Sequence, residues 1–382
     1  MRGVHCSFVF NCRWYHGAPW PWWYQGMKVD KKTCAYLWVF TAAVICLVSL
    51  SWSIRAPGNI LRRSGQDGDQ PNHGEVHSNV TTEAINFTNY RELLKTAYDQ
   101  RYEGHINPHD FSLVLDEPLA CMEYERGRPR RVFLLVLVAT SPANFKRRQA
   151  VRETWGSPAA LDGRAIVTLF LLGKTVNSYL YRNVLKESAE HHDLLMEDFA
   201  DRYKNLTLKT MMAMKWASTH CPQASFVMKT DDDMFVSYRN LLDYLAAMSA
   251  PDTGFALGRV LEGKAPFRDP KSKYFVSKEA YPGDVYPPWL SGGGFVLSGD
   301  MPGRIYSASL DTRFLYLEDV YVGMCLQKLK VTPIMSDRFN NVHIGYSYCM
   351  FRYLITSHRF DPEELRAAWK DMLVPRTCWF WT

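Results

Sequence analysis

Concentrated positive charge is largely missing from this sequence. No run of five or six Lys or Arg residues occurs and the formal net charge is only +6, so the chain lacks a basic block that would neutralise a nucleic-acid backbone. Zinc-type spacing is also missing, because no CxxC pair or Cys/His cluster with the spacing of a zinc site occurs among the nine cysteines. These absences argue against nucleic acid as a partner and against structural zinc. What remains is an ordinary globular composition, in a chain long enough for one large domain with appendages or two modest domains.

One long apolar run lies near the amino end, at residues 36–54. It carries no charge and is about as long as a helix needs to cross a bilayer. No clean small-residue cleavage site follows it, which favours an uncleaved anchor over a removable signal peptide. We therefore expect a cytoplasmic tail at 1–35, a transmembrane signal-anchor at 36–54, a flexible polar stem at 55–108 and a lumenal catalytic domain at 109–382. As a hypothesis, Met27 is an initiation site and 1–26 is an upstream extension.

Features of the secretory lumen all follow this anchor. Three N-glycosylation sequons begin at Asn79, Asn86 and Asn205, and five of the nine cysteines lie beyond residue 54. Basic residues flank the apolar run on both sides and do not orient it. The sequons and cysteines therefore predict a type II membrane protein whose bulk is lumenal. Five is an odd number, so at least one of these cysteines has no partner within the lumenal part.

An acidic triplet follows a short apolar run in residues 225–236 (SFVMKTDDDMFV). The run predicts a buried strand, and side chains at the carboxyl end of such a strand project into the ligand crevice of an α/β sheet. Asp231 and Asp233 are therefore candidate ligands of Mg²⁺ or Mn²⁺ bridging substrate phosphates. A solvated turn or a helix cap is the simpler alternative. An EF-hand is excluded, because the loop would need an oxygen ligand at Phe235 and glycine at Val236.

The pattern ahead of the triplet predicts a βαβ unit. Residues 131–140 form a continuous apolar run typical of a central parallel strand, a helical segment ends at Gly156, and a second strand is predicted at 166–172. This favours an α/β fold with a doubly wound sheet. In that helix, Arg148 and Arg152 are candidate contacts for a nucleotide diphosphate, and a salt-bridged surface helix is the alternative. Residues 187–201 are interpreted as acidic helix or loop, and 205–220 as a core-facing helix.

An aromatic residue and a glycine run stand together in residues 286–295 (YPPWLSGGGF). Trp289 offers a flat apolar face of the kind that binds a sugar ring. A flexible loop at Gly292, Gly293 and Gly294 would let the backbone approach a ligand closely. The alternative is a tight connection ahead of a strand at 295–298.

A second acidic pair, Glu318 and Asp319, begins a predicted helix that runs to Leu329. The simpler interpretation is that one of them caps this helix. A carboxylate in this position, facing a metal-bound phosphosugar, would instead take a proton from an attacking hydroxyl. Because Glu318 and Asp319 are neighbours, one can cap the helix while the other accepts the proton.

Taken in order, several segments resemble the β1,3-glycosyltransferase family, which comprises β1,3-galactosyltransferases and β1,3-N-acetylglucosaminyltransferases. They are residues 148–156 (RQAVRETWG), 170–173 (FLLG), 205–210 (NLTLKT), 229–233 (KTDDD) and 318–323 (EDVYVG). The likeness extends over residues 107–372. It implies a GT-A fold, a Golgi type II membrane enzyme, a UDP-sugar donor and Mn²⁺.

The resemblance also implies roles for single residues. Asp231, Asp233 and His358 correspond to the metal ligands, although His358 by itself would pass for an ordinary exposed histidine. Asp319 corresponds to the catalytic base of an inverting, single-step transfer. The donor-binding set is Arg148, Arg152, Lys229 and Asp232, and the set for the acceptor and sugar pocket is Trp289, Gly292, Gly293, Gly294 and Glu318.

The resemblance divides over the donor sugar. Residues 266–269 and 272–273, Thr230 and the 318–319 pair favour the galactosyl branch, whereas the glycine run and the triple Asp favour the N-acetylglucosaminyl branch. Leu290 stands where galactosyl members commonly have Cys. We predict transfer of galactose from UDP-galactose in β1,3 linkage to a GlcNAc-type acceptor, with UDP-GlcNAc as the alternative donor.

Two other classes of function fit the sequence less well. A catalytically silent, sugar-binding relative would be free to lose Asp319 or His358, and both are present. A metal-dependent phosphohydrolase would be expected to offer a second metal cluster or an obvious nucleophile, and neither is found in the sequence. The expected partners are a UDP-sugar donor, a glycan acceptor ending in GlcNAc or Gal, and the Golgi membrane, with homo- or hetero-oligomerisation left open.

Overall fold

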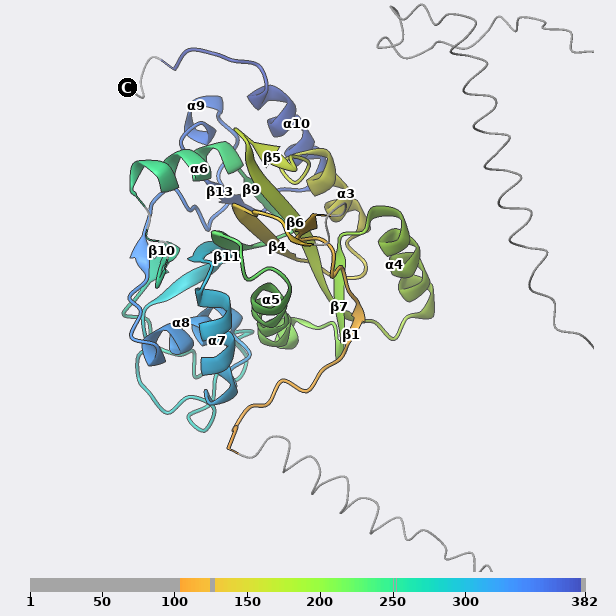
Figure 1. Cartoon of the computed structure of the whole chain (residues 1–382). Helices are drawn as coiled ribbons and strands as arrows, with labels where there is room; N and C mark the ends of the chain where they lie inside the picture. Colours follow the sequence, from red (N-terminus) through yellow and green to blue (C-terminus); the bar gives the residue numbers. More distant parts are fainter. Residues whose placement is uncertain (1–103, 124–127, 250, 252, 379–382) are drawn as a thin grey trace, which may run out of the picture. The chain divides into compact units, whose positions relative to one another are not determined.

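Four parallel strands form the middle of a mixed sheet in this computed structural model (Figure 1). β4 (Leu134–Ala139) lies between β6 (Arg164–Lys174) and β8 (Phe226–Asp231), and β7 (Leu194–Ala200) lies beyond β6. All six residues of β4 are buried, as expected of an apolar strand covered on both faces. The predicted βαβ unit at 131–172 is confirmed, with α3 (Phe145–Glu153) as its helix.

The structure describes residues 104–123, 128–249, 251 and 253–378, all of which belong to the compact unit that begins at Ala84. The predicted tail and anchor, most of the stem, Asn79 and Asn86 lie outside the described residues. Within the part of the chain that is described, no helix is both long enough and apolar enough to cross a membrane.

Within these residues the sheet has nine strands, and the others lie at its edges. They are β1 (Leu113–Leu115) beside β7, β5 (Ala160–Leu161) beside β6, and β11 (Trp289–Ser298), β10 (Ala256–Leu261) and β12 (Ile334–Met335) beyond β8. Because β11 runs antiparallel to β8, the sheet is mixed. Two small sheets add β2 (Met122–Glu123) with β3 (Arg128–Pro129) and β9 (Met234–Val236) with β13 (Thr356–His358).

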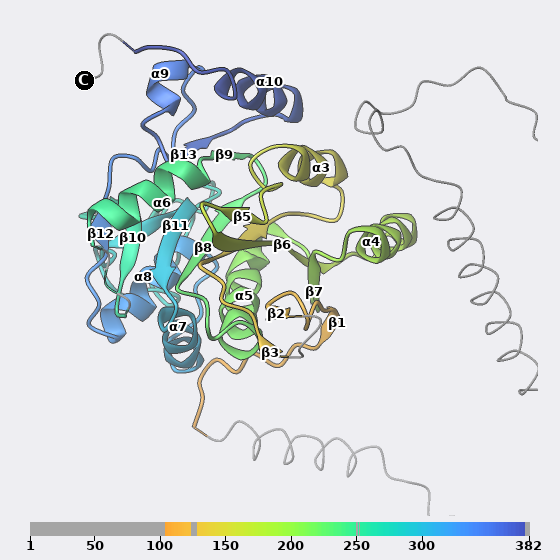
Figure 2. The ribbon, with the colours of Figure 1, turned by 45° about the horizontal axis from the view of Figure 1, so that its top comes forward.

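Helices cover both faces of the sheet. Because side chains along β4 alternate in direction, this strand contributes to the core on each face. Leu134, Val136 and Val138 share one core with α3, α4 (Ser178–His191), α6 (Tyr238–Ala247), α9 (Tyr348–Phe351) and α10 (Pro362–Met372). Leu135 and Leu137 face the other way and pack against α5 (Leu206–His220), which follows the short 3-10 turn η2 (Tyr203–Asn205). Figures 1 and 2 show α7 (Met301–Leu310) and α8 (Glu318–Lys328) beside α5. The predicted α/β class and the core-facing helix at 205–220 are confirmed.

Two parts of the sequence interpretation were wrong. Residues 187–201 are not acidic helix or loop throughout, because α4 ends at His191 and β7 follows as a buried strand. Glu197 hid this strand: it is buried, and its carboxylate lies 2.6 Å from His109 Nε2. The glycines at 292–294 do not form a loop either, since they lie inside β11, which begins at Trp289.

Disulfides join segments that are distant in the sequence. Cys121 pairs with Cys221 in the core that packs against α5, and Cys349 pairs with Cys378. Cys325 is buried and free, which agrees with the odd number of cysteines beyond residue 54.

Candidate active site

Two adjoining cavities lie where β4 and β8 end. The strand-end cavity, of about 380 Å³, is lined by Thr140, Asn144, Lys209 and the triplet 231–233 among others. The aromatic cavity, of about 790 Å³, is lined by Tyr274, Tyr286, Trp289, Glu318 and Asp319 among others. Asp231, Asp233 and His358 line both cavities. Asp233 and Asp319, which are far apart in the sequence, therefore meet in one cleft.

Strand pairing explains how His358 reaches the triplet. After Asp231 the chain turns through Asp232 and Asp233 and enters β9, which pairs antiparallel with β13. His358 is opposite Met234 in this register, and its Nε2 lies 3.6 Å from Asp233 Oδ1. The neighbouring Asp233 carboxylate raises the pKa of His358. Burial works against ionisation of Asp233, but His358 and Arg147 outweigh it and lower its pKa.

The middle carboxylate of the triplet is held in place by the end of β4. Asp232 Oδ2 accepts hydrogen bonds from Thr140 Oγ1 at 2.6 Å and from Asn144 Nδ2 at 2.8 Å. Burial nevertheless raises its pKa. Arg147 Nη1 lies 3.7 Å from Asp232 Oδ1 and 3.6 Å from Asp233 Oδ2, so one partly exposed cation faces two of the three carboxylates.

Lys229 supports the cleft from beneath. It was predicted to contact the donor, but it is 1% exposed and lines neither cavity. Its Nζ donates to Asp231 Oδ1 at 2.7 Å and to the Gly292 carbonyl at 2.6 Å, and lies 3.5 Å from Glu318 Oε1. Burial opposes its charge, yet Asp231 and Glu318 raise its pKa. The cation thereby ties the triplet strand, β11 and the start of α8 together.

The acidic pair at the start of α8 faces the aromatic cavity. Asp319 Oδ2 accepts a hydrogen bond from Trp289 Nε1 at 3.2 Å, and its Oδ1 accepts one from the Val320 N–H at 2.8 Å. Burial raises the pKa of Asp319, and it raises the pKa of Glu318 to about 7. A carboxylate that is fixed in orientation and holds a proton more readily than usual suits a general base.

Gly292 makes room for this pair. A Cβ at that position would lie 2.2 Å from Glu318 Oε1, so the absence of a side chain is what allows Glu318 to approach β11. Gly293 also lines the aromatic cavity, and a Cβ there would meet only the Met234 thioether at 3.3 Å. Gly294 does not line the cavity, because it faces Thr356.

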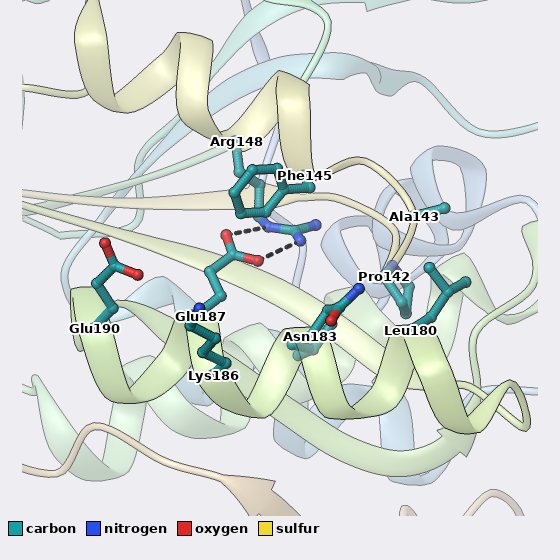
Figure 3. Close-up of a pocket in the computed structure, with 10 residues that line it drawn as sticks. Pro142, Ala143, Phe145, Arg148, Leu180, Asn183, Lys186, Glu187 and Glu190 are labelled. Atoms are coloured by element: carbon teal, nitrogen blue, oxygen red, sulfur yellow. Dashed lines mark hydrogen bonds and ion pairs between the residues drawn. The ribbon is translucent and has the colours of Figure 1, made fainter.

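Arg148 and Arg152 line neither cavity. A separate pocket of about 300 Å³ is lined by residues of α3 and α4. Figure 3 shows the Arg148 guanidinium bound directly to the Glu187 carboxylate at this pocket. Its Nε and Nη2 donate to Glu187 at 2.8 and 2.6 Å, and Arg152 binds Asp193 through two hydrogen bonds of 2.8 Å. This placement does not provide direct donor contact, and it matches the salt-bridge alternative in its ion pairs but not in surface exposure, because Arg148 is fully buried. Arg148 Nη1 also lies 3.3 Å from Thr140 Oγ1, so it supports the end of β4.

Several residues of the cleft had no signal in the sequence analysis. Lys209 is buried in α5, donates to the Thr140 carbonyl and forms an ion pair of 2.9 Å with Asp201. Arg147 belongs to the same helix as Arg148 and Arg152, the two candidate contacts for the diphosphate. The helical period alone could not decide which of these three arginines faces the triplet. The segment 262–288, which forms much of the aromatic cavity wall, has almost no regular structure and so gives no periodic signal.

Asn205, the one predicted glycosylation site within the described residues, lies at the start of α5. Its Nδ2 donates to the Ala200 carbonyl at 2.8 Å and the residue is half-buried. Thr207 of the same sequon is buried, and its hydroxyl donates to the Leu315 carbonyl at 2.7 Å.

Part of the expected metal ligand set fits a divalent cation. Among the described residues no group of three or more His, Cys, Asp or Glu side chains is arranged to hold a metal ion. Asp233 Oδ1 and His358 Nε2 are 3.6 Å apart, and two ligands about 2.1 Å from one cation at right angles are about 3 Å apart, so a small shift suffices. Asp231 fits less well, because Lys229 already binds its Oδ1. Oxygens of a bound phosphate would complete such a site.

Comparisons with known proteins identify the family of this chain. The Galactosyltransferase family model matches residues 146–337. Beta-1,3-galactosyltransferase 1 of Mus musculus and of Homo sapiens are each 40% identical over 346 residues, which is 90% of this chain and 97% of theirs. Beta-1,3-galactosyltransferase 2 of Homo sapiens is 39% identical over 281 residues, 72% of this chain and 65% of that protein.

Solved structures show weaker likeness. A glycosyltransferase involved in the glycosylation of the major capsid of PBCV-1 has 9% identity and a TM-score of 0.35, covering 62% of this chain and 98% of that one. Mouse xyloside xylosyltransferase 1 has 13% identity and a TM-score of 0.33, covering 59% and 97%. Likeness at this level carries no argument about function. From the family model and the curated relatives, the chain belongs to the galactosyltransferase family, a family of β1,3-glycosyltransferases, as its motifs predicted.

Proposed function

We propose that this protein is an inverting hexosyltransferase that transfers galactose from UDP-galactose in β1,3 linkage to a glycan ending in GlcNAc. The observation that carries the proposal is the meeting of Asp319 with Asp233 and His358 in the aromatic cavity. The names of the relatives support galactose and the β1,3 linkage. Glycan acceptors ending in Gal, and UDP-GlcNAc as donor, are the comparisons that a test has to include.

The two cavities suggest how the donor is divided between them. We propose that the nucleoside occupies the strand-end cavity beside Asp232 and that the sugar occupies the aromatic cavity, with the diphosphate near Asp233 and His358, which line both. Arg147 would offset negative charge at this junction. When bound, Mn²⁺ at Asp233 and His358 would offset the charge that builds on the leaving diphosphate.

Asp319 is the proposed base. Its carboxylate takes the proton of the acceptor hydroxyl as that oxygen forms a bond to the anomeric carbon. The bond from the anomeric carbon to the β-phosphate oxygen breaks at the same time, and UDP leaves with the electron pair. Trp289 and the Val320 N–H hold the carboxylate in orientation, so little rearrangement is needed. The proton on Asp319 then passes to solvent, and no covalent sugar intermediate forms.

The test is a donor and acceptor panel on the purified full chain, with Mn²⁺ or a chelator. We expect metal-dependent galactose transfer to a GlcNAc-terminated acceptor, with the product linkage determined by NMR. Asp319→Asn should lower kcat by about 10³-fold, whereas Glu318→Gln should lower it less. UDP-galactose hydrolysis that ignores the acceptor would favour a phosphohydrolase. Sugar binding without any turnover would favour the silent relative.

We further propose that the chain is a single-pass type II protein of the Golgi membrane. The disulfides Cys121–Cys221 and Cys349–Cys378 support an oxidising compartment for the catalytic domain. Protease protection in sealed vesicles is the test: the catalytic domain should resist digestion until detergent is added. Digestion without detergent would contradict a lumenal location.

A further inference from the structure

Residues 262–288 form much of the aromatic cavity wall. This segment connects β10 to β11 and contributes Lys264, Ala265, Phe267, Lys273, Tyr274 and Tyr286 to the cavity. An isolated bridge between Phe267 and Phe275 is its only strand-like pairing in the described residues. Five backbone hydrogen bonds join residues within this segment, among them one from the Val276 N–H to the Phe267 carbonyl, and most of its other backbone groups need other partners.

One side chain inside the segment binds four of its carbonyls. Arg268 Nη1 donates to the carbonyls of Val276 and Ser277, both at 2.8 Å. Its Nη2 donates to those of Tyr281 and Gly283, at 2.9 and 2.7 Å. A planar guanidinium carries N–H groups in fixed directions, so it can hold several carbonyls in one geometry in a way that a lysine ammonium cannot.

We infer that Arg268 is a positioning residue that preforms the acceptor-binding wall of the aromatic cavity. Four carbonyls gathered around one cation bring residues 276–283 back against the start of the segment, where Phe267 and Lys264 stand. The Tyr286 N–H closes the same fold by donating to the Lys264 carbonyl at 3.0 Å. The aromatic rings of the wall are thus in place before a sugar arrives, and binding does not have to order them. This inference rests on the proposed function, because a wall that binds an acceptor presupposes a transferase.

The wall has a second support that offers a matched control. Arg313 lies outside the segment, and its Nη1 donates to the single carbonyl of Glu279 at 2.7 Å, in an exposed position. Arg268→Met and Arg313→Met each remove one positive charge and shorten the side chain by the same amount. They differ in the number of wall carbonyls released, four against one.

The experiment compares both variants and Arg268→Lys in the purified full chain. Arg268→Met should raise the acceptor KM about tenfold, since two or three wall side chains must then be ordered on binding. The KM for UDP-galactose should rise less than that for the acceptor, because only the galactose of the donor reaches the aromatic cavity and the proposed nucleoside site contains none of the wall. Arg268→Lys should recover only part of the loss. Arg313→Met should behave as wild type.

Hydrogen exchange over residues 262–288 separates this inference from the proposed function. Faster exchange confined to that segment in Arg268→Met, with acceptor binding weakened in calorimetry, would support the wall even if the wild type transferred no sugar. Unchanged exchange would overturn it. So would an equal rise of donor and acceptor KM with a lowered Tm, since that describes general destabilisation.

Discussion

Replacing Gly292 by alanine tests whether the site depends on the close approach of β11 to α8. The new Cβ would lie 2.2 Å from Glu318 Oε1 and 3.3 Å from its Cδ. Ordinary van der Waals contact begins near 3.4 Å, so the carboxylate must retreat by about 1 Å. It cannot do so freely, because its side chain is only 14% exposed, the Lys229 ammonium lies 3.5 Å from Oε1, and its neighbour along the chain is Asp319.

The expected losses follow from that displacement. A misplacement of about 1 Å near the reacting groups costs about 10²-fold in rate, so kcat should fall by about that factor. Overpacking of this kind costs about 1–3 kcal/mol of unfolding free energy, which lowers Tm by about 5 °C in a domain of this size. Alanine is no worse than glycine in a strand, so backbone preference would not produce the loss.

Gly293→Ala is the matched comparison. Its Cβ would meet only the Met234 thioether, at 3.3 Å, and a methionine side chain adapts readily. We expect less than about a tenfold loss of kcat and a Tm close to that of wild type. Initial rates of UDP release and thermal melts of both variants make the measurement. Equal losses in the two variants, or a fully active Gly292→Ala enzyme, would refute the reasoning.

Three further predictions concern the groups around this contact. Lys229→Met leaves Asp231 and Glu318 without their buried cation, so it should lower the unfolding free energy by about 3–5 kcal/mol in chemical denaturation. Adding Glu318→Gln should restore part of this loss, and an unfolding free energy unchanged from wild type in Lys229→Met would contradict the supporting role of Lys229. The value of kcat/KM should rise with pH as Asp319 and Glu318 lose their protons, because burial raises the pKa of both, that of Glu318 to about 7; a kcat/KM independent of pH between 5 and 8 would argue against a carboxylate base. Because the raised pKa favours the protonated form in the folded state, the contribution of Glu318 to stability should decline between pH 4.5 and about 7. Trp289→Phe removes a hydrogen bond that lowers the pKa of Asp319, so the rise of kcat/KM with pH should move to higher pH. A shift to lower pH would show that the indole does not stabilise the carboxylate.

Much of the fold could be predicted from local patterns. The apolar run at β4 and the strand before the triplet are continuous, and a period of two or a buried run can be recognised without tertiary contacts. β7 was missed because Glu197 interrupts its pattern, and the partner that makes this burial tolerable, His109, lies 88 residues away. The start of β11 was missed because glycines carry no side-chain signal of either structure.

The site divides in a similar way. Residue type and spacing identified Asp231, Asp233, Glu318 and Asp319 as chemical groups, and the family resemblance added His358. Spacing along a helix could not tell which arginine of α3 faces the cleft, since that depends on how α3 lies against α4. The structure turns Arg148 toward Glu187 and leaves Arg147 beside the triplet.

The sequence by itself determined that this chain carries an acidic strand end, a second acidic pair at a helix start and a largely apolar α/β core. Only the tertiary structure decided that these acidic groups share one cleft, because that depends on β11 pairing with β8 and on β13 pairing with β9. It also decided that Lys229 and Arg268 act as internal supports. Their partners are carbonyls and carboxylates brought together by folding, and no local pattern of residues records such contacts.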